Sequence, residues 1–155
     1  MESFSGKEAA EKIVATATSM IGKYPYSWGG GDDFGATKGI QQRIPPYCDD
    51  RNVVGFDCSG LAKYSVYQGT HKSMIHHAQT QYDNAPVRVP LAERLPGDLV
   101  FFGVDTSSIK HVAIYIGDDM MIEAPGHNDD GTGIPVRKVP LRTKNIIDSV
   151  ARYWA

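Results

Sequence analysis

Residues 55–65 read GFDCSGLAKYS, and this stretch places a cysteine where a loop enters a helix. The helical pattern continues to Gln68 and Gly69 ends it, so we expect a helix over 58–68. Upstream, apolar residues recur every three or four positions from Lys7 to Ile21, which predicts an amphipathic helix. Downstream, short runs rich in Val, Ile, Phe and Tyr predict strands over 98–103, 111–117, 120–124, 135–139 and 149–154. Helices followed by strands indicate an α+β fold in which N-terminal helices pack on a small antiparallel β-sheet. A shorter helix is expected within 74–82.

The length of 155 residues suits one domain spanning 1–155. From about residue 29 to 55 the chain is rich in glycine and has no sustained period, which predicts a long loop. Loops of this length in compact domains are usually functional or disordered.

Composition excludes several classes of function. The net charge is −2 and no basic stripe is present, which argues against nucleic acid and anionic membranes as partners. No apolar run approaches the roughly 18 residues of a spanning helix, so membrane insertion is not expected. The start of the chain lacks the pattern of a signal peptide. Zinc-ligand spacings are also missing, and we expect no metal and no cofactor.

Cys58 is the candidate nucleophile. At a helix N-terminus, unpaired N–H groups and the helix dipole favour a thiolate, which is the reactive form of cysteine. Glycines at 55 and 60 permit close backbone approach, and the turn's N–H groups could bind an oxyanion. Two alternatives stay open: a buried structural cysteine, or a disulfide with Cys48, the other cysteine of the chain.

His111 is the candidate base because it begins the apolar strand HVAIYIG, residues 111–117. A thiolate nucleophile is commonly paired with histidine. A histidine satisfied at the edge of the sheet is the alternative interpretation.

Glu123 is the candidate that orients His111, since it interrupts the apolar stretch MMIEA one strand later. A three-residue turn at 117–119 would make Glu123 face Ala113 and put it on the face of His111. A two-residue turn without a bulge would put the two side chains on opposite faces. A solvated edge carboxylate is the alternative.

Four motifs in order resemble the NlpC/P60 family of cell-wall endopeptidases: PYSWGGG (25–31), GFDCSGLAKYS (55–65), LPGDLVFF (95–102) and HVAIYIG (111–117). The resemblance covers roughly Ile13 to Tyr153. In sequence, MIEAPG (121–126) and VARYW (150–154) most resemble actinobacterial peptidoglycan hydrolases.

The resemblance implies a papain-like α+β fold and hydrolysis of the bond between γ-D-glutamate and a diamino acid, meso-diaminopimelate, in peptidoglycan stem peptides. It assigns Cys58 as nucleophile, His111 as base and Glu123 as the orienting group.

By the same resemblance, Tyr26 shapes the oxyanion region, and Asp57 and Ser59 hold the stem peptide. The stretch from Trp28 to Cys58 is longer than in compact members and could rim or cover the cleft.

Other residues and alternatives are less determined. His77 is a candidate substrate contact and ranks above His76 in that role. The alternative is that both are exposed helix residues. Trp28 is either core or cleft wall. The expected partners are stem peptides or muropeptides, for a monomer that is secreted or associated with the cell wall. A papain-like acyltransferase or amidase, a catalytically silent wall-binding module, and a toxin with a cognate inhibitor or immunity protein stay open as alternatives.

Overall fold

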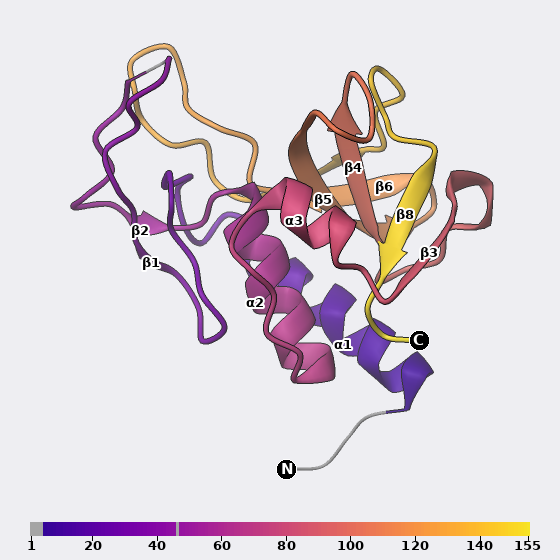
Figure 1. Cartoon of the computed structure of the whole chain (residues 1–155). Helices are drawn as coiled ribbons and strands as arrows, with labels where there is room; N and C mark the ends of the chain where they lie inside the picture. The colour runs from indigo at the N-terminus through magenta and orange to yellow at the C-terminus, as the bar shows by residue number, and fades with distance from the viewer. Residues whose placement is uncertain (1–4, 46) are drawn as a thin grey trace.

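The computed structural model describes residues 5–45 and 47–155, and Figure 1 shows their arrangement. The predictions about the first four residues and about residue 46 of the long loop lie outside this part of the chain. Three helices and one six-stranded antiparallel sheet form the body of the molecule, which confirms the predicted α+β class. No helix in the described ranges is long and apolar enough to cross a membrane.

Two N-terminal helices pack against one another beneath the sheet. α1 spans Gly6–Ser19, and its N-cap Ser5 accepts a hydrogen bond from the N–H of Glu8. Its buried residues include Ala9, Ile13 and Ala17, as the apolar spacing predicts. The predicted end at Ile21 is wrong: the helix stops at Ser19, and Ile21 is exposed.

α2 spans Cys58–Thr70 and begins at the predicted residue, but the predicted end at Gln68 is wrong, since Gly69 lies inside the helix. Its side chains Leu61, Ala62 and Val66 are completely buried in the main core. Complete burial of a leucine or valine side chain contributes about 1.5–3 kcal/mol, so the core holds this helix firmly in place. A short α3, Ala78–Asp83, follows the connection at 71–77.

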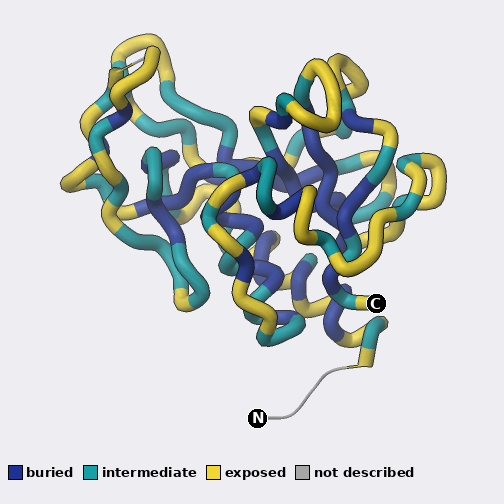
Figure 2. Tube along the Cα trace, in the orientation of Figure 1, coloured by how far each residue is buried: buried dark blue, intermediate teal, exposed yellow. Residues whose placement is uncertain are grey.

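The sheet has the strand order β3-β8-β4-β5-β6-β7. Its strands are β3 Val87–Pro90, β4 Leu99–Gly103, β5 Ile109–Gly117, β6 Met120–Glu123, β7 Arg137–Pro140 and β8 Ser149–Arg152. β3, paired with β8 at the edge, was not predicted as a strand, and a single turn of 3-10 helix, Leu91–Glu93, follows it. Figure 2 shows that β4, β5 and β8 are largely buried, whereas the connecting loops are exposed.

The long segment at 29–55 is mostly irregular, as predicted, and also contains two short paired strands, β1 Thr37–Lys38 and β2 Val54–Gly55. Together with the loop after β6 it forms the left-hand part of the molecule in Figure 1. A buried ion pair joins the two loops, with His127 Nε2 lying 2.6 Å from Asp50 Oδ2. The N–H of Tyr26 also donates to the carbonyl of Ile134, which ties the loop after β6 to the segment at 25–31.

Candidate active site

Cys58 lies at the first position of α2, where the chain turns out of the loop. Asp57 caps the helix by accepting a 2.7 Å hydrogen bond from the N–H of Gly60. A Cβ added at Gly60 would lie 2.0 Å from the carbonyl oxygen of Gly30, so only glycine permits this approach between loop and helix. Both cysteines of the chain are free thiols and half-buried, which rules out the disulfide alternative in this structure.

His111 and Glu123 meet across the β5–β6 hairpin, with His111 Nε2 lying 2.7 Å from Glu123 Oε1. The pairing of Ile114 with Ile122 is the register expected for a three-residue turn. The turn itself differs from that prediction: Gly117 pairs with Met120, and a bulge at Ile116 compensates for the shorter loop.

Asp118 and Asp119 form that two-residue turn, and both have φ near +55° (53° and 55°). A type I′ turn requires positive φ at both central residues, and aspartate is among the residues that tolerate it.

Glu123 is completely buried at the centre of a cationic cluster. Arg142 donates to both of its carboxylate oxygens at 2.9 and 2.6 Å, and Arg137 Nε donates at 3.0 Å. Burial would raise the pKa of Glu123, but the hydrogen bonds from Arg142, His111 and Arg137 outweigh it and hold the pKa well below its usual range. The residue is therefore a fixed anion behind the imidazole.

The charge state of His111 follows from its two neighbours. Burial alone would lower the pKa of His111, but its hydrogen bonds with Cys58 and Glu123, and the negative charge of each, raise the pKa to about 9. Because Nε2 faces Glu123, Nδ1 is the ring nitrogen available to the thiol. The arrangement favours a protonated imidazole beside Cys58.

Tyr26 is buried next to the cysteine and lines the same cleft. Burial raises the pKa of Tyr26, and the negative charges of Cys58, Asp57 and Asp50 raise it further. Its hydroxyl therefore stays protonated and can donate a hydrogen bond. The rings of Tyr26 and His127 meet edge to face at 4.9 Å between centroids.

The cleft between loop 29–55, α2 and the sheet has a volume of about 1110 Å³. Of the predicted site residues it is lined by Tyr26, Trp28, Asp57, Cys58, Ser59, His77 and His111. Glu123 is absent from the lining because it lies buried behind His111. Trp28 is a half-buried cleft wall, and Ile40 and Ile44 show that the long loop contributes to the rim.

The sequence analysis ranked His77 above His76, and the structure shows how each of them is held. His76 lies in the connection before α3, not on an exposed helix face, and its Nε2 is 2.6 Å from Asp57 Oδ1. His77 is instead the N-cap residue of α3, and its Nδ1 is 3.0 Å from Thr80 Oγ1. Both histidines line the cleft, but only His76 is bonded to the residue beside the cysteine.

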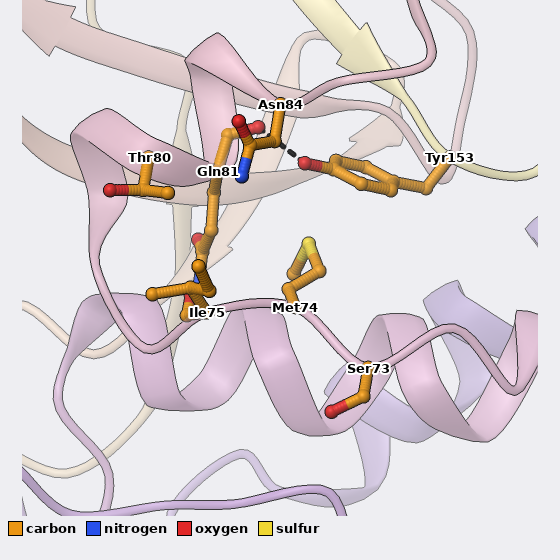
Figure 3. A pocket seen from close by; sticks show the side chains of 7 residues that line it. All are labelled: Ser73, Met74, Ile75, Thr80, Gln81, Asn84 and Tyr153. Carbon is orange, nitrogen blue, oxygen red and sulfur yellow. Dashed lines mark hydrogen bonds between the residues drawn. The ribbon is translucent and has the colours of Figure 1, made fainter.

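Gln81 fixes the segment that carries His76. Its Nε2 donates to the carbonyls of Ser59 and Ile75, each at 3.0 Å, and so links α2 to that segment. A smaller hollow of about 290 Å³ lies beside it, where Met74 stands between Gln81 and Tyr153 (Figure 3). The hydroxyl of Tyr153 donates to the carbonyl of Gln81 and closes this side of the support.

Among the described residues, no group of three or more His, Cys, Asp or Glu side chains is placed to hold a metal ion. The reactive groups of the cleft are a thiol, an imidazole and a phenol. Together they can perform nucleophilic acyl transfer with general acid–base assistance.

The chain belongs to the NlpC/P60 family, whose sequence pattern matches residues 22–144. Among individual proteins it is similar to peptidoglycan endopeptidase RipA of Mycobacterium tuberculosis, with 38% identity over 96% of this chain and 28% of RipA. A solved structure of RipA superimposes with a TM-score of 0.79 at 36% identity, covering 96% of this chain and 63% of that one.

Two further relatives also have solved structures. Peptidoglycan hydrolase RipB of M. tuberculosis has a solved structure with a TM-score of 0.78 at 36% identity, covering 96% of this chain and 66% of that one. RipD of the same organism, described as a non-catalytic NlpC/p60 domain protein adapted to peptidoglycan binding, gives 0.74 at 28% identity, covering 93% of this chain and 96% of that one. The chain spans about a quarter of the length of RipA and about half that of the curated RipB sequence.

Proposed function

We propose that this chain is a cysteine endopeptidase that cleaves the γ-D-glutamyl–diamino acid bond of peptidoglycan stem peptides outside the cytoplasm. The observation that carries the proposal is the series Cys58, His111 and Glu123, in which a buried carboxylate holds the imidazole beside a thiol at a helix N-terminus. RipA and RipB, named as peptidoglycan endopeptidases, supply the substrate class.

The relatives also support the three roles. Solved RipA structures include variants changed at a cysteine, a histidine and a glutamate. That histidine and glutamate are twelve positions apart, as are His111 and Glu123. RipD shows that a domain of this fold can lack catalysis, so the activity of this chain depends on its site and not on its fold.

In the proposed reaction the Cys58 thiolate attacks the amide carbonyl and forms a C–S bond, while the carbonyl oxygen becomes an oxyanion. Backbone N–H groups at the start of α2 and the Tyr26 hydroxyl stabilise that charge. His111 then transfers its proton to the leaving nitrogen as the C–N bond breaks. Water attacks the thioester and gives a proton to His111, and cleavage of the C–S bond restores the thiolate.

Asp57 already accepts hydrogen bonds from Gly29 and Gly60 and contacts His76, so its first role is to shape the cleft. Contact of Asp57, Ser59, Trp28 and His77 with the stem peptide belongs to the same proposal.

Digestion of purified peptidoglycan, followed by mass spectrometry, tests the function. Wild type should release fragments that begin with the diamino acid, and Cys58→Ala should release none while keeping its circular dichroism spectrum. Cys48→Ala is the matched control, because Cys48 is also a free, half-buried thiol and should be dispensable. Full hydrolysis by Cys58→Ala, or fragments cut at another bond, would refute the proposal.

A further inference from the structure

Positive charge gathers on one side of the cleft, although the whole chain carries a net charge of −2. We call Lys110, Arg137, Arg142 and Lys144, which all line the cleft, the basic lip. Asp57 is the carboxylate that lines the cleft among the described residues, and it is bound to His76. The lip therefore faces no free anion of the protein across the cleft.

Lys110, the residue before His111, lies in a bulge of β5. Phe102 pairs with His111 and Gly103 pairs with Ile109, so Lys110 is an extra residue between the two pairs. In a regular strand, adjacent side chains point to opposite faces. A bulge re-aims side chains locally, which explains how Lys110 and His111 line the same cleft.

Lys144 reaches the lip from a different segment. The turn at 143–146 closes through a hydrogen bond from the N–H of Ile146 to the carbonyl of Thr143. This turn is attached to the end of β4, since the N–H of Gly103 donates to the carbonyl of Asn145 at 2.9 Å. Figure 1 shows the β4–β5 connection and the β7–β8 connection next to one another above β4 and β8. Lys144 is thus presented by a fixed turn.

The four cations are not equally engaged. Arg137 and Arg142 are both bound to Glu123, which supplies one negative charge for two positive ones. Across residues 5–45 and 47–155, the ion pairs formed include neither Lys110 nor Lys144. The lip consequently has an excess of positive charge and two exposed ammonium groups.

The position of the lip relative to His111 suggests which part of the substrate it meets. In the proposed reaction His111 delivers its proton to the leaving nitrogen, so the leaving fragment lies on the side of His111. Lys110 is adjacent to His111 in the chain, and Arg142 lies over the ring of Phe102, which in turn contacts His111. An ammonium or guanidinium group at this position favours an anion on the leaving fragment.

We propose that the basic lip, through Lys110 and Lys144, binds a carboxylate carried by the leaving fragment and thereby selects diamino acids that bear one. This inference rests on the proposed function and names the specificity of the same site. The side chain of a diaminopimelate residue ends in a carboxylate beside its ammonium group, whereas a lysine side chain ends in the ammonium group alone, which the lip would repel. The terminal carboxylate of the fragment offers the same chemistry.

Synthetic L-Ala-γ-D-Glu tripeptides separate these sources. The third residue is meso-diaminopimelate, diaminopimelate amidated at its side-chain carboxyl, or L-lysine. Each tripeptide is made with a free and with an amidated C-terminus, and a further pair carries an amidated glutamate α-carboxyl. Wild type should cleave peptides with a leaving-side carboxylate with a kcat/KM about tenfold or more above that of the peptides without one. The peptide whose carboxylate restores cleavage identifies which carboxylate the basic lip binds.

The variants are Lys110→Gln, Lys144→Gln and the double change, with Lys138→Gln as matched control. Lys138 is an exposed lysine on β7 that does not line the cleft. The double variant should lose most of the preference, mainly through a higher KM for the peptides that carry a leaving-side carboxylate. The control should keep the preference. Because the lysines are exposed, the preference of wild type should also fall with added salt.

Equal cleavage by wild type of peptides with and without a leaving-side carboxylate, or an unchanged preference in the double variant, would overturn the inference and leave the proposed function standing. A preference that follows the glutamate carboxyl would overturn it too. If wild type cleaves no peptide, the proposed function fails. Calorimetric binding of the peptides to Cys58→Ala, with and without the two lysine changes, then decides the inference by itself.

Discussion

Glu123 Oε1 lies 2.7 Å from His111 Nε2, and the same carboxylate is held from behind by two arginines. The imidazole is thus oriented by a charge that cannot move, because Glu123 is completely buried. This relationship determines both the direction of His111 and its protonation.

Glu123→Gln should lower kcat/KM by about 10²-fold or more, since general acid–base catalysis depends on the orientation and charge of the base. The amide can still contact the ring but removes the anion that raises the pKa of His111. Initial rates on a stem peptide measure the effect. A variant that retained wild-type kcat/KM would contradict the orienting role.

Activity should decline as pH rises through about 9, because His111 then loses the proton required by the leaving nitrogen. In Glu123→Gln the pKa of His111 should be lower, so the basic limb of the kcat/KM profile should move to lower pH. The pH–rate profiles of the two proteins, recorded side by side, test this; coincident basic limbs would argue against it.

The same raised pKa contributes to stability. The pKa of His111 is about 9 in the folded chain against an ordinary value of 6.5, so the stabilisation is complete below pH 6.5 and is lost as pH rises towards 9. The difference in urea midpoint between wild type and His111→Asn should therefore shrink between pH 6 and pH 9.5. A constant difference would show that the protonated imidazole does not stabilise the fold.

Tyr26→Phe should reduce kcat by about 10²-fold with a smaller change in KM, because it removes a proton donor that acts on the oxyanion. The phenyl ring can keep the edge-to-face contact with His127, so the fold should be preserved. Steady-state kinetics give both parameters. A change confined to KM would place Tyr26 in substrate binding only.

Asp98→Asn should destabilise the fold by about 3 kcal/mol, since it leaves Arg152 charged and nearly buried without its anion. Asp98 is completely buried and also accepts hydrogen bonds from the Trp154 indole and the N–H of Leu95. Urea unfolding gives the free energy. Asp148→Asn, at an exposed position, is the control and should change it little.

Asp50→Ala should loosen the loop at 29–55, because Asp50 binds His127 and accepts a hydrogen bond from the N–H of Trp28. Ile40 and Ile44 of this loop line the cleft, so KM should rise severalfold while kcat falls less. Limited proteolysis should also cut faster between residues 40 and 50. Unchanged cleavage and KM would show that the buried pair does not fix the loop.

The pairing of His111 with Glu123 could be predicted because its signals are local. A histidine at the head of an apolar strand and a carboxylate that interrupts the next strand both stand out from their apolar neighbours, and the register follows from the turn. The predicted turn was too long by one residue, yet the register held, because the bulge at Ile116 offsets a shorter turn. Local sequence does not specify such compensation.

Contacts between distant segments could not be predicted in this way. Asp50 and His127 are 77 positions apart, and Asp98 and Arg152 are 54 apart. No periodic pattern connects such residues, since their meeting depends on how loops and strands pack. One signal was available at Asp98, which stands directly before four apolar residues that form the start of a buried strand.

β5 carries both the proposed base, His111, and a lysine of the basic lip, Lys110. Because Lys110 is the extra residue of a bulge, a change in the length of the strand can affect one without the other. Deleting this one residue would leave the pairing of His111 with Phe102 unchanged and would remove an ammonium group from the cleft. Insertions or deletions in the β4–β5 hairpin can thus alter which peptides are accepted and leave the reacting groups unchanged. Comparing hairpin lengths, and not only residue identities, would therefore be informative when substrate preferences of such domains are sorted.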